Sequence, residues 1–294
     1  MERNLPPTSI LIAVAGSPDL LRQQLRAIRH YSNSPVRIIV LDDSRRRPHY
    51  SNQRRLNTPA SIRKVSLELG ADYHRVPQRR HAYRRRYFPS TTRAWYAGPS
   101  LRTADTLNYG MQLIDSHSRG FLAILDSDMI PVRPFDVGDI LSESEICYLP
   151  QKRSNEFQDF TYPWPGIFFA NLKTISRTAD LNWDCANIHG VALDTGGGLH
   201  DWVAERSDVS RIITGLHSNS WKWAEDTPNV SDSLRDFLEI DSQLNNGTQF
   251  AELFDDTFLH LRAGSNWDPK MREHHEYRLN SFVKFIDTEL SSKT

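Results

Sequence analysis

Two acidic residues, one position apart, follow a short apolar run. The run is residues 121–125 (FLAIL), and Asp126, Ser127 and Asp128 come directly after it. Carboxylates held this close repel each other unless a cation lies between them. Mg²⁺ and Mn²⁺ take oxygen ligands and are often shared with substrate phosphates. The triplet therefore predicts a clamp for a divalent metal and a diphosphate. The alternative is a solvated turn whose acids cap a helix.

The elements that must position these acids alternate between strand and helix. Apolar runs at residues 10–14 and 36–41 predict strands, and the residues between them have helical spacing. Short apolar strands joined by helices predict an α/β fold, with a mostly parallel sheet covered on both faces. Right-handed crossovers bring the carboxyl ends of such strands to one edge, where ligands bind. Asp42 and Asp43 fall at that edge together with the triplet.

Other segments extend this pattern along the chain. Helices are expected at residues 59–69, 103–114, 202–213 and 233–244, and strands at residues 73–76, 146–149, 167–170 and 258–261. Neither an internal repeat nor a linker is visible, so we expect one domain over residues 1–294.

Composition limits the class of protein. Two cysteines among 294 residues, Cys147 and Cys185, make neither a disulfide framework nor a zinc site. The apolar runs are far too short for a transmembrane segment, and the first one is typical of a strand rather than a signal peptide. These features predict a cytoplasmic, reducing location.

Charge is distributed unevenly although the net charge is zero. Residues 45–102 contain fifteen basic and two acidic residues, whereas residues 103–294 contain 16 basic and 30 acidic residues. Within residues 77–102, arginines alternate with aromatic residues, a combination that can follow phosphates and stack on bases. We expect contact with an anionic acceptor or surface there. The alternative is that these arginines grip a donor diphosphate and pair with the acidic second half.

Taken as an ordered set, four segments resemble a GT-A fold glycosyltransferase of the broad family 2 type. They are ILIAVAGSPDLLRQQL, VRIIVLDDS, LRTADTLNYGMQL and FLAILDSDMIP, with the Asp-x-Asp motif in the last. The resemblance covers about the first 135 residues. It implies a Rossmann-like sheet and transfer of a hexosyl group from a UDP-, GDP- or dTDP-sugar with Mn²⁺ or Mg²⁺. It also implies a donor- and metal-binding half, residues 1–135, and an acceptor-binding half, residues 136–294.

The resemblance assigns roles to individual residues. Asp42 or Asp43 would bond the ribose or base of the donor, Asp126 would reach the ribose directly or through the metal, and Asp128 would ligate the metal. Late histidines ligate the metal in several such families, which implies that role for His260. Arg262 would brace the diphosphate, and Ala13 and Arg102 are predicted to line the donor site. His260 could instead be a hydrogen-bonded core histidine, and Asp255 and Asp256 compete with it as ligands.

An inverting enzyme also needs a base that takes the proton of the acceptor hydroxyl. The candidates are Asp194 and Asp201 in the segment LDTGGGLHDW, together with Glu225 and Asp226. Asp194 is favoured because the glycines after it would let the backbone approach a ligand. The alternative for Asp194 is a plain helix N-cap, and a retaining enzyme requires no such base.

Three functions remain open from the sequence. The first is glycosyl transfer to a carbohydrate or lipid-linked acceptor. The second keeps the same site but takes a hydroxylated base in DNA as its acceptor, bound through residues 77–102. The third is a nucleotide- or nucleic-acid-binding module with an inactive site, against which the intact Asp126, Asp128 and His260 argue.

Overall fold

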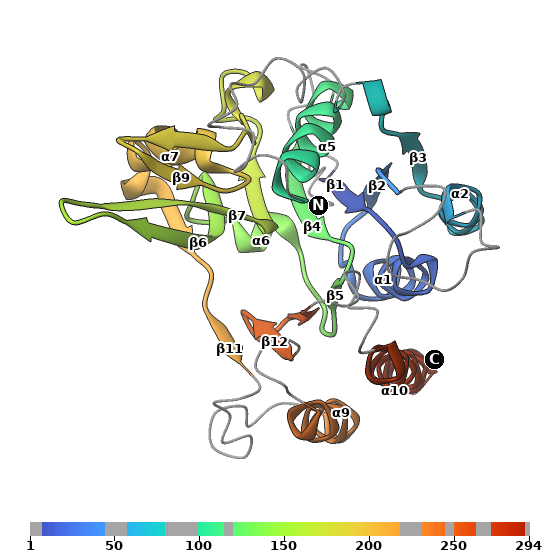
Figure 1. The fold of residues 1–294 in the computed structure, drawn as a ribbon. Helices are drawn as coiled ribbons and strands as arrows, with labels where there is room; N and C mark the ends of the chain where they lie inside the picture. The colour runs from blue at the N-terminus through green and yellow to red at the C-terminus, as the bar shows by residue number, and fades with distance from the viewer. Residues whose placement is uncertain are drawn as a thin grey trace, which may run out of the picture.

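The computed structural model describes residues 8–44, 58–79, 81, 99–114, 120–217, 231–244, 250–262 and 272–291. Its largest sheet has seven strands in the order β10-β6-β7-β4-β1-β2-β3 (Figure 1). These strands are β1 (Thr8–Val14), β2 (Val36–Asp42), β3 (Asp72–Arg75), β4 (Phe121–Asp126), β6 (Ile146–Ser154), β7 (Asp159–Asn171) and β10 (Ser210–Ile212). Only β7 runs antiparallel to its neighbours. The expected α/β fold with a mostly parallel sheet is confirmed.

Helices cover both faces of this sheet (Figure 1). They include α1 (Pro18–Tyr31), α2 (Thr58–Glu68), α5 (Pro99–Leu113), α6 (Val137–Ile140) and α7 (His200–Ala204). Neighbouring residues of β1 point to opposite faces: Ile10 and Ile12 join one core with Leu25 of α1, whereas Leu11 joins another with Leu107 of α5. Because both faces are buried, the strand is a continuous apolar run.

A second, antiparallel sheet begins where β4 ends. Its strand order is β11-β12-β13-β5. The strands are β11 (Gly215–His217), β12 (Ala251–Phe254), β13 (Phe258–Leu261) and β5 (Met129–Pro131). Only Ser127 and Asp128 separate β4 from β5, so this sheet carries a late segment of the chain to the acidic triplet. Two helices, α9 (Asp232–Gln243) and α10 (Arg272–Ser291), pack together beside it (Figure 1).

One expected helix is wrong. Residues 202–213 form the end of α7, a 3₁₀ turn at Ser207–Val209 and the edge strand β10. The β-branched residues Ile212 and Ile213 favour a strand, and β10 pairs with β6 in parallel. Sheet pairing therefore outweighs the helical spacing. The sequence patterns also do not indicate α10, β12, or the hairpin of β8 (Ala186–Ile188) and β9 (Val191–Leu193).

The other expected elements are present with ends that differ by a few residues. They are α2, α5, α9, β3, β6, β7 and β13. The largest difference is in β6 and β7, which continue as a long hairpin beyond the body of the molecule (Figure 1). Within the described residues, none of the helices is both long enough and apolar enough to cross a membrane.

Candidate active site

The carboxyl ends of three parallel strands bring the predicted donor residues together. In the strand register, Ala13 of β1 pairs with Leu41 of β2 on one side and with Asp126 of β4 on the other. Val14 and Asp42 form the next pair. The structure thus places Ala13, Asp42 and Asp126 at one edge of the sheet, where the sequence predicts them.

A buried glutamine fixes the turn between β4 and β5. Gln24 of α1 is fully buried, and its Nε2 donates to the backbone oxygens of Asp126 at 2.6 Å and Met129 at 2.7 Å. These bonds hold the backbone on both sides of Asp128. Gln24 is not among the residues predicted from the sequence, although a polar residue on the apolar side of a helical pattern is a signal for such a role.

Strand pairing brings His260 to the acidic triplet. His260 of β13 lies opposite Met129 of β5, and the backbone nitrogen of Leu261 donates to the backbone oxygen of Asp128 at 2.9 Å. In this arrangement Nε2 of His260 lies 3.5 Å from Oδ1 of Asp128. Its Nδ1 lies 2.6 Å from Oε2 of Glu252, which faces it from β12. Glu252 is not among the site residues that the sequence indicates.

Burial and charge shift the pKa values in this corner. Burial, together with the charge of Asp128, raises the pKa of Asp126 to about 7. Burial alone would lower the pKa of His260, but its interactions with Asp128 and Glu252 outweigh that effect and raise it to about 10. Ionisable groups whose pKa values are shifted by burial and by neighbouring charges are frequent at functional sites.

The donor atoms of this corner suit a metal that is shared with a substrate. No group of three or more His, Cys, Asp or Glu side chains in the described ranges is arranged to hold a metal ion alone. Asp128 and His260 do converge, with side chains only 5% and 7% exposed. Mg²⁺ is commonly bound by one or two carboxylates, with substrate phosphates and water as further ligands. The pair of Asp128 and His260, with Asp126 beside it, fits that pattern, because the substrate and water would supply the remaining ligands.

Asp42 is fully buried and its carboxylate has three protein partners. Oδ1 accepts from the backbone nitrogen of Ser44 at 2.8 Å and pairs with Arg75 at 2.8 Å, and Oδ2 accepts from the hydroxyl of Tyr73 at 2.7 Å. Burial and this bond to Asp42 raise the pKa of Tyr73. Asp42 therefore fixes β3 and the chain after β2 at the donor edge.

Asp43 joins segments on both sides of residues 82–98, which themselves lie outside the described residues. Its Oδ1 accepts from Gln78 at 2.9 Å and lies 2.8 Å from Nε2 of His81, and Nε of Arg102 donates to Oδ2 at 2.7 Å. The other ring nitrogen of His81 lies 2.8 Å from the buried Asp105. Burial would raise the pKa of Asp43, but the bonds from His81 and Arg102 lower it.

The two predicted bases differ in their surroundings. Asp194 follows β9, and its Oδ1 accepts from the backbone nitrogen of Thr195 at 2.8 Å. It is not a helix N-cap, because Gly196 occupies that position of the following 3₁₀ turn. Thr195 donates to the backbone oxygen of Ser100 at 2.7 Å, which ties this loop to the first turn of α5. Asp201 lies on α7 with a side chain that is 90% exposed.

The glycine run after Asp194 approaches the protein's own backbone. A Cβ atom on Gly196 would lie 2.4 Å from the backbone oxygen of Pro163, and one on Gly198 would lie 2.9 Å from that of Asn182. Gly196 also has a φ of +92°, which favours glycine. The run is therefore explained by packing, and the expected approach to a ligand is not needed to account for it.

Arg262 follows β13 and lies next to Glu252. Its guanidinium is half exposed, 3.9 Å from Oε1 of Glu252, and lies over the ring of Phe250 at 4.9 Å. Its backbone oxygen accepts from Nη1 of the buried Arg278 at 3.1 Å.

The other candidate base, Glu225-Asp226, falls outside the described residues, as does most of residues 77–102.

The expected competition from Asp255 and Asp256 is wrong. Both residues form the turn between β12 and β13, with φ values of 47° and 52°. Asp255 pairs with Arg211 of β10 at 2.7 Å. Strand β10 pairs with the beginning of β6, so this turn lies at the amino edge of the main sheet, away from Asp128.

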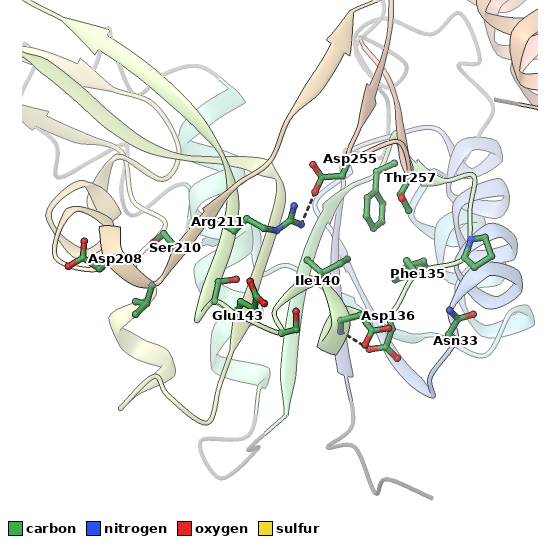
Figure 2. A pocket seen from close by; sticks show the side chains of 16 residues that line it. Asn33, Phe135, Asp136, Ile140, Glu143, Asp208, Ser210, Arg211, Asp255 and Thr257 are labelled. Atoms are coloured by element: carbon green, nitrogen blue, oxygen red, sulfur yellow. Dashed lines mark hydrogen bonds and ion pairs between the residues drawn. The ribbon is translucent and has the colours of Figure 1, made fainter. Parts of the chain in front are cut away.

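A cavity of about 690 Å³ lies at that amino edge (Figure 2). Asp136, Asp139 and Glu143 line it together with the pair of Arg211 and Asp255. Apart from Asp255, none of the predicted donor or metal residues is among those that line it. This cavity is therefore separate from the candidate site, which is built from strand ends and from the β13–β5 pairing.

Comparison with known proteins gives a limited result. No protein-family model matches this chain, and no curated protein matches it. Among solved structures it is similar to glucosyl-3-phosphoglycerate synthase from Mycobacterium tuberculosis in complex with Mn²⁺, UDP and glucosyl-3-phosphoglycerate. The identity is 13%, the match covers 87% of each chain, and the TM-score is 0.40.

Two further solved structures are glycosyltransferases. The galactosyltransferase LgtC, with donor and acceptor sugar analogues, is 14% identical, with 68% of this chain and 66% of that chain covered and a TM-score of 0.32. The glycosyltransferase GlyE from Streptococcus pneumoniae is 13% identical, with 70% and 45% covered and a TM-score of 0.33. This chain therefore spans less than two thirds of either. At such low identities and TM-scores, the likenesses establish neither a family nor an activity.

Proposed function

We propose that this protein is a metal-dependent glycosyltransferase of the GT-A type that uses a nucleotide sugar. One observation carries the proposal: Asp128, two residues after the end of β4, lies 3.5 Å from His260 of β13 in a buried corner next to Asp126, at the carboxyl edge of the main sheet. Burial and the neighbouring charge of Asp128 raise the pKa of Asp126, and a divalent cation shared with a diphosphate would relieve that repulsion.

Each residue of the corner has a proposed role. Asp128 and His260 would hold Mn²⁺ or Mg²⁺, and Asp126 would face the ribose or the metal. Bound there, the metal would neutralise the charge that builds on the departing nucleoside diphosphate. Arg262, half exposed beside Glu252, would brace the same diphosphate.

The nucleoside would lie at the ends of β1 and β2. Ala13 lies in register with Asp126 and leaves that edge without a bulky side chain. Asp42 and Asp43 are saturated by protein groups, so we propose that they shape this part of the site. For Asp42 or Asp43 to bond the ribose or base directly, the donor would have to replace one of the protein partners of that carboxylate. Arg102, held by Asp43, would carry positive charge toward the donor.

Residues 136–294 would supply the acceptor side of a single catalytic domain. Asp194 is our first candidate for the base that takes the proton of the acceptor hydroxyl, and Asp201 is the second. The bond from Thr195 to Ser100 supports Asp194, because it places the loop beside the amino end of α5. That end lies at the carboxyl edge of the sheet, since α5 leads into β4 from the side where β3 ends.

For the acceptor we propose a carbohydrate or a lipid-linked sugar. No contact among the described residues favours a DNA base as the acceptor, and most of residues 77–102, which suggested it, lies outside them. The converging acids and histidine argue against an inactive binding module. A cytoplasmic location is part of the proposal and agrees with two free cysteines.

A donor screen tests the proposed function. Melting of the protein would be followed with UDP-, GDP- and dTDP-sugars, with and without Mn²⁺. One donor class at about 100 times its Kd is expected to stabilise the fold by about 2.7 kcal/mol, only when Mn²⁺ is present. Asp128→Ala should abolish this effect. The control is Asp139→Ala, which removes an exposed carboxylate at the opposite edge and should keep it. Stabilisation that survives Asp128→Ala would count against the site.

A further inference from the structure

Glu252 is a buried carboxylate that lies next to two residues of the proposed site, His260 and Arg262. It lies on β12, directly opposite His260 of β13, and is only 5% exposed. Its Oε2 is 2.6 Å from Nδ1 of His260, and its Oε1 is 3.9 Å from the guanidinium of Arg262. A carboxylate is costly to bury unless partners compensate its charge, so its position between these two groups needs an explanation.

The contact with Glu252 determines which nitrogen of His260 faces the acids. An imidazole nitrogen that bonds to a carboxylate carries a proton, and the other nitrogen is then the one that can bind a metal. Here Nδ1 points to Glu252, and Nε2 points to Asp128 at 3.5 Å. The ring also packs edge-on against Trp164, with 5.1 Å between ring centroids, so rotation of the ring meets resistance on a second side.

We propose that Glu252 is a positioning residue that holds His260 through Nδ1 so that Nε2 is the ring nitrogen that faces the metal–diphosphate site. This inference rests on the proposed function, because it assumes that His260 is a metal ligand. The contact between Glu252 and Arg262 is long and its arginine is half exposed, so it contributes little energy compared with the short bond to His260.

Two substitutions separate orientation from charge. Glu252→Gln loses the charge but keeps the reach, and its amide oxygen can still accept from Nδ1 of His260. Glu252→Asp keeps the charge, but its side chain is one methylene shorter and no longer reaches the ring. Binding of Mn²⁺ in the presence of UDP would be measured from the electron paramagnetic resonance signal of free Mn²⁺, which requires no turnover.

The expected result is an asymmetry between the two variants. Glu252→Gln should bind Mn²⁺ within about threefold of the unchanged protein, whereas Glu252→Asp should bind it about 10- to 100-fold more weakly. A purely electrostatic or structural role predicts that Glu252→Asp is the milder change. The matched control is Glu289→Asp, a similarly buried glutamate that accepts from Ser231 and Ser233 and should leave the affinity unchanged.

The other possible results contradict either the positioning role of Glu252 or the proposed function. Equal affinity for Glu252→Asp and the unchanged protein would overturn the positioning role, as would Glu252→Gln binding as weakly as Glu252→Asp. If the unchanged protein itself binds no Mn²⁺ with UDP, the proposed function fails and the role of Glu252 fails with it. Circular dichroism melts of all variants would confirm that weak binding does not reflect unfolding.

Discussion

At the scale of single residues, His81 shows how charge is balanced at the donor edge. Its ring lies between two buried carboxylates, Asp43 and Asp105, each at 2.8 Å. Burial would lower the pKa of His81, but these hydrogen bonds and charges raise it above the usual value of 6.5. The protonated ring therefore stabilises the fold and holds the chain on one side of residues 82–98.

This arrangement predicts a pH-dependent loss of stability in His81→Gln. Because the folded pKa of His81 is raised, its contribution is complete below about pH 6.5 and is lost as the pH rises through the folded value. The variant should be less stable than the unchanged protein by about 1–3 kcal/mol at pH 6, and the difference should shrink toward pH 9. Urea unfolding at several pH values measures it. A difference that is constant with pH would contradict the assignment.

The residue scale also shows what sequence reasoning can find. Asp126 and Asp128 stand out in the sequence because carboxylates directly after an apolar strand are costly to bury. His260 stands out because its neighbours are apolar. Glu252 and Gln24 were missed because their roles depend on which segment lies opposite. Gln24 bonds a backbone oxygen 102 positions away, and the sequence patterns do not indicate strand β12, which carries Glu252.

At the scale of elements, a buried ion pair ties the two late helices to the site. Nε of Arg278 on α10 donates to Asp241 on α9 at 2.8 Å, and both side chains are 1% exposed. Asp241 also accepts from the backbone nitrogen of Ala251 at the start of β12, and Arg278 donates to the backbone oxygen of Arg262 after β13. The pair therefore anchors the β12–β13 hairpin, which carries His260.

Removing one partner of this pair should be strongly destabilising. Arg278→Met leaves the carboxylate of Asp241 buried without its cation, and we expect a loss of about 3–5 kcal/mol of unfolding free energy. The control is Arg177→Met, in an exposed pair with Asp180 whose arginine is 77% exposed, and a change within about 0.5 kcal/mol is expected there. Similar losses in the two variants, measured by urea unfolding, would show that the buried pair is not an anchor.

Elements were predictable where one pattern dominates. The first strands are buried on both faces and so read as apolar runs, and α1 starts at Ser17 and Pro18, a typical cap and first-turn residue. The spacing of residues 202–213 predicts a helix where β10 lies, and it misleads because the strand depends on pairing with β6, which the local sequence does not show. The second sheet was not predictable as a unit, since its strands come from residues 129–131 and 215–261.

At the scale of the whole molecule, the two sheets meet at the acidic triplet. The main sheet delivers Asp126 at the end of β4, and the second sheet returns His260 to Asp128 through the pairing of β13 with β5. Most of the basic residues of 45–102 lie outside the described residues, so the expected anionic contact through residues 77–102 stays a prediction. The described acids at the amino edge line a separate cavity (Figure 2).

The most direct test is to locate the metal. Crystals would be grown with MnCl₂ and the donor class that stabilises the protein, and an anomalous difference map would be calculated at the manganese absorption edge. We predict a peak between a carboxylate oxygen of Asp128 and Nε2 of His260, next to the diphosphate. A bound diphosphate with no such peak, or a peak only in the acidic cavity beside Asp136 and Asp139, would contradict the account.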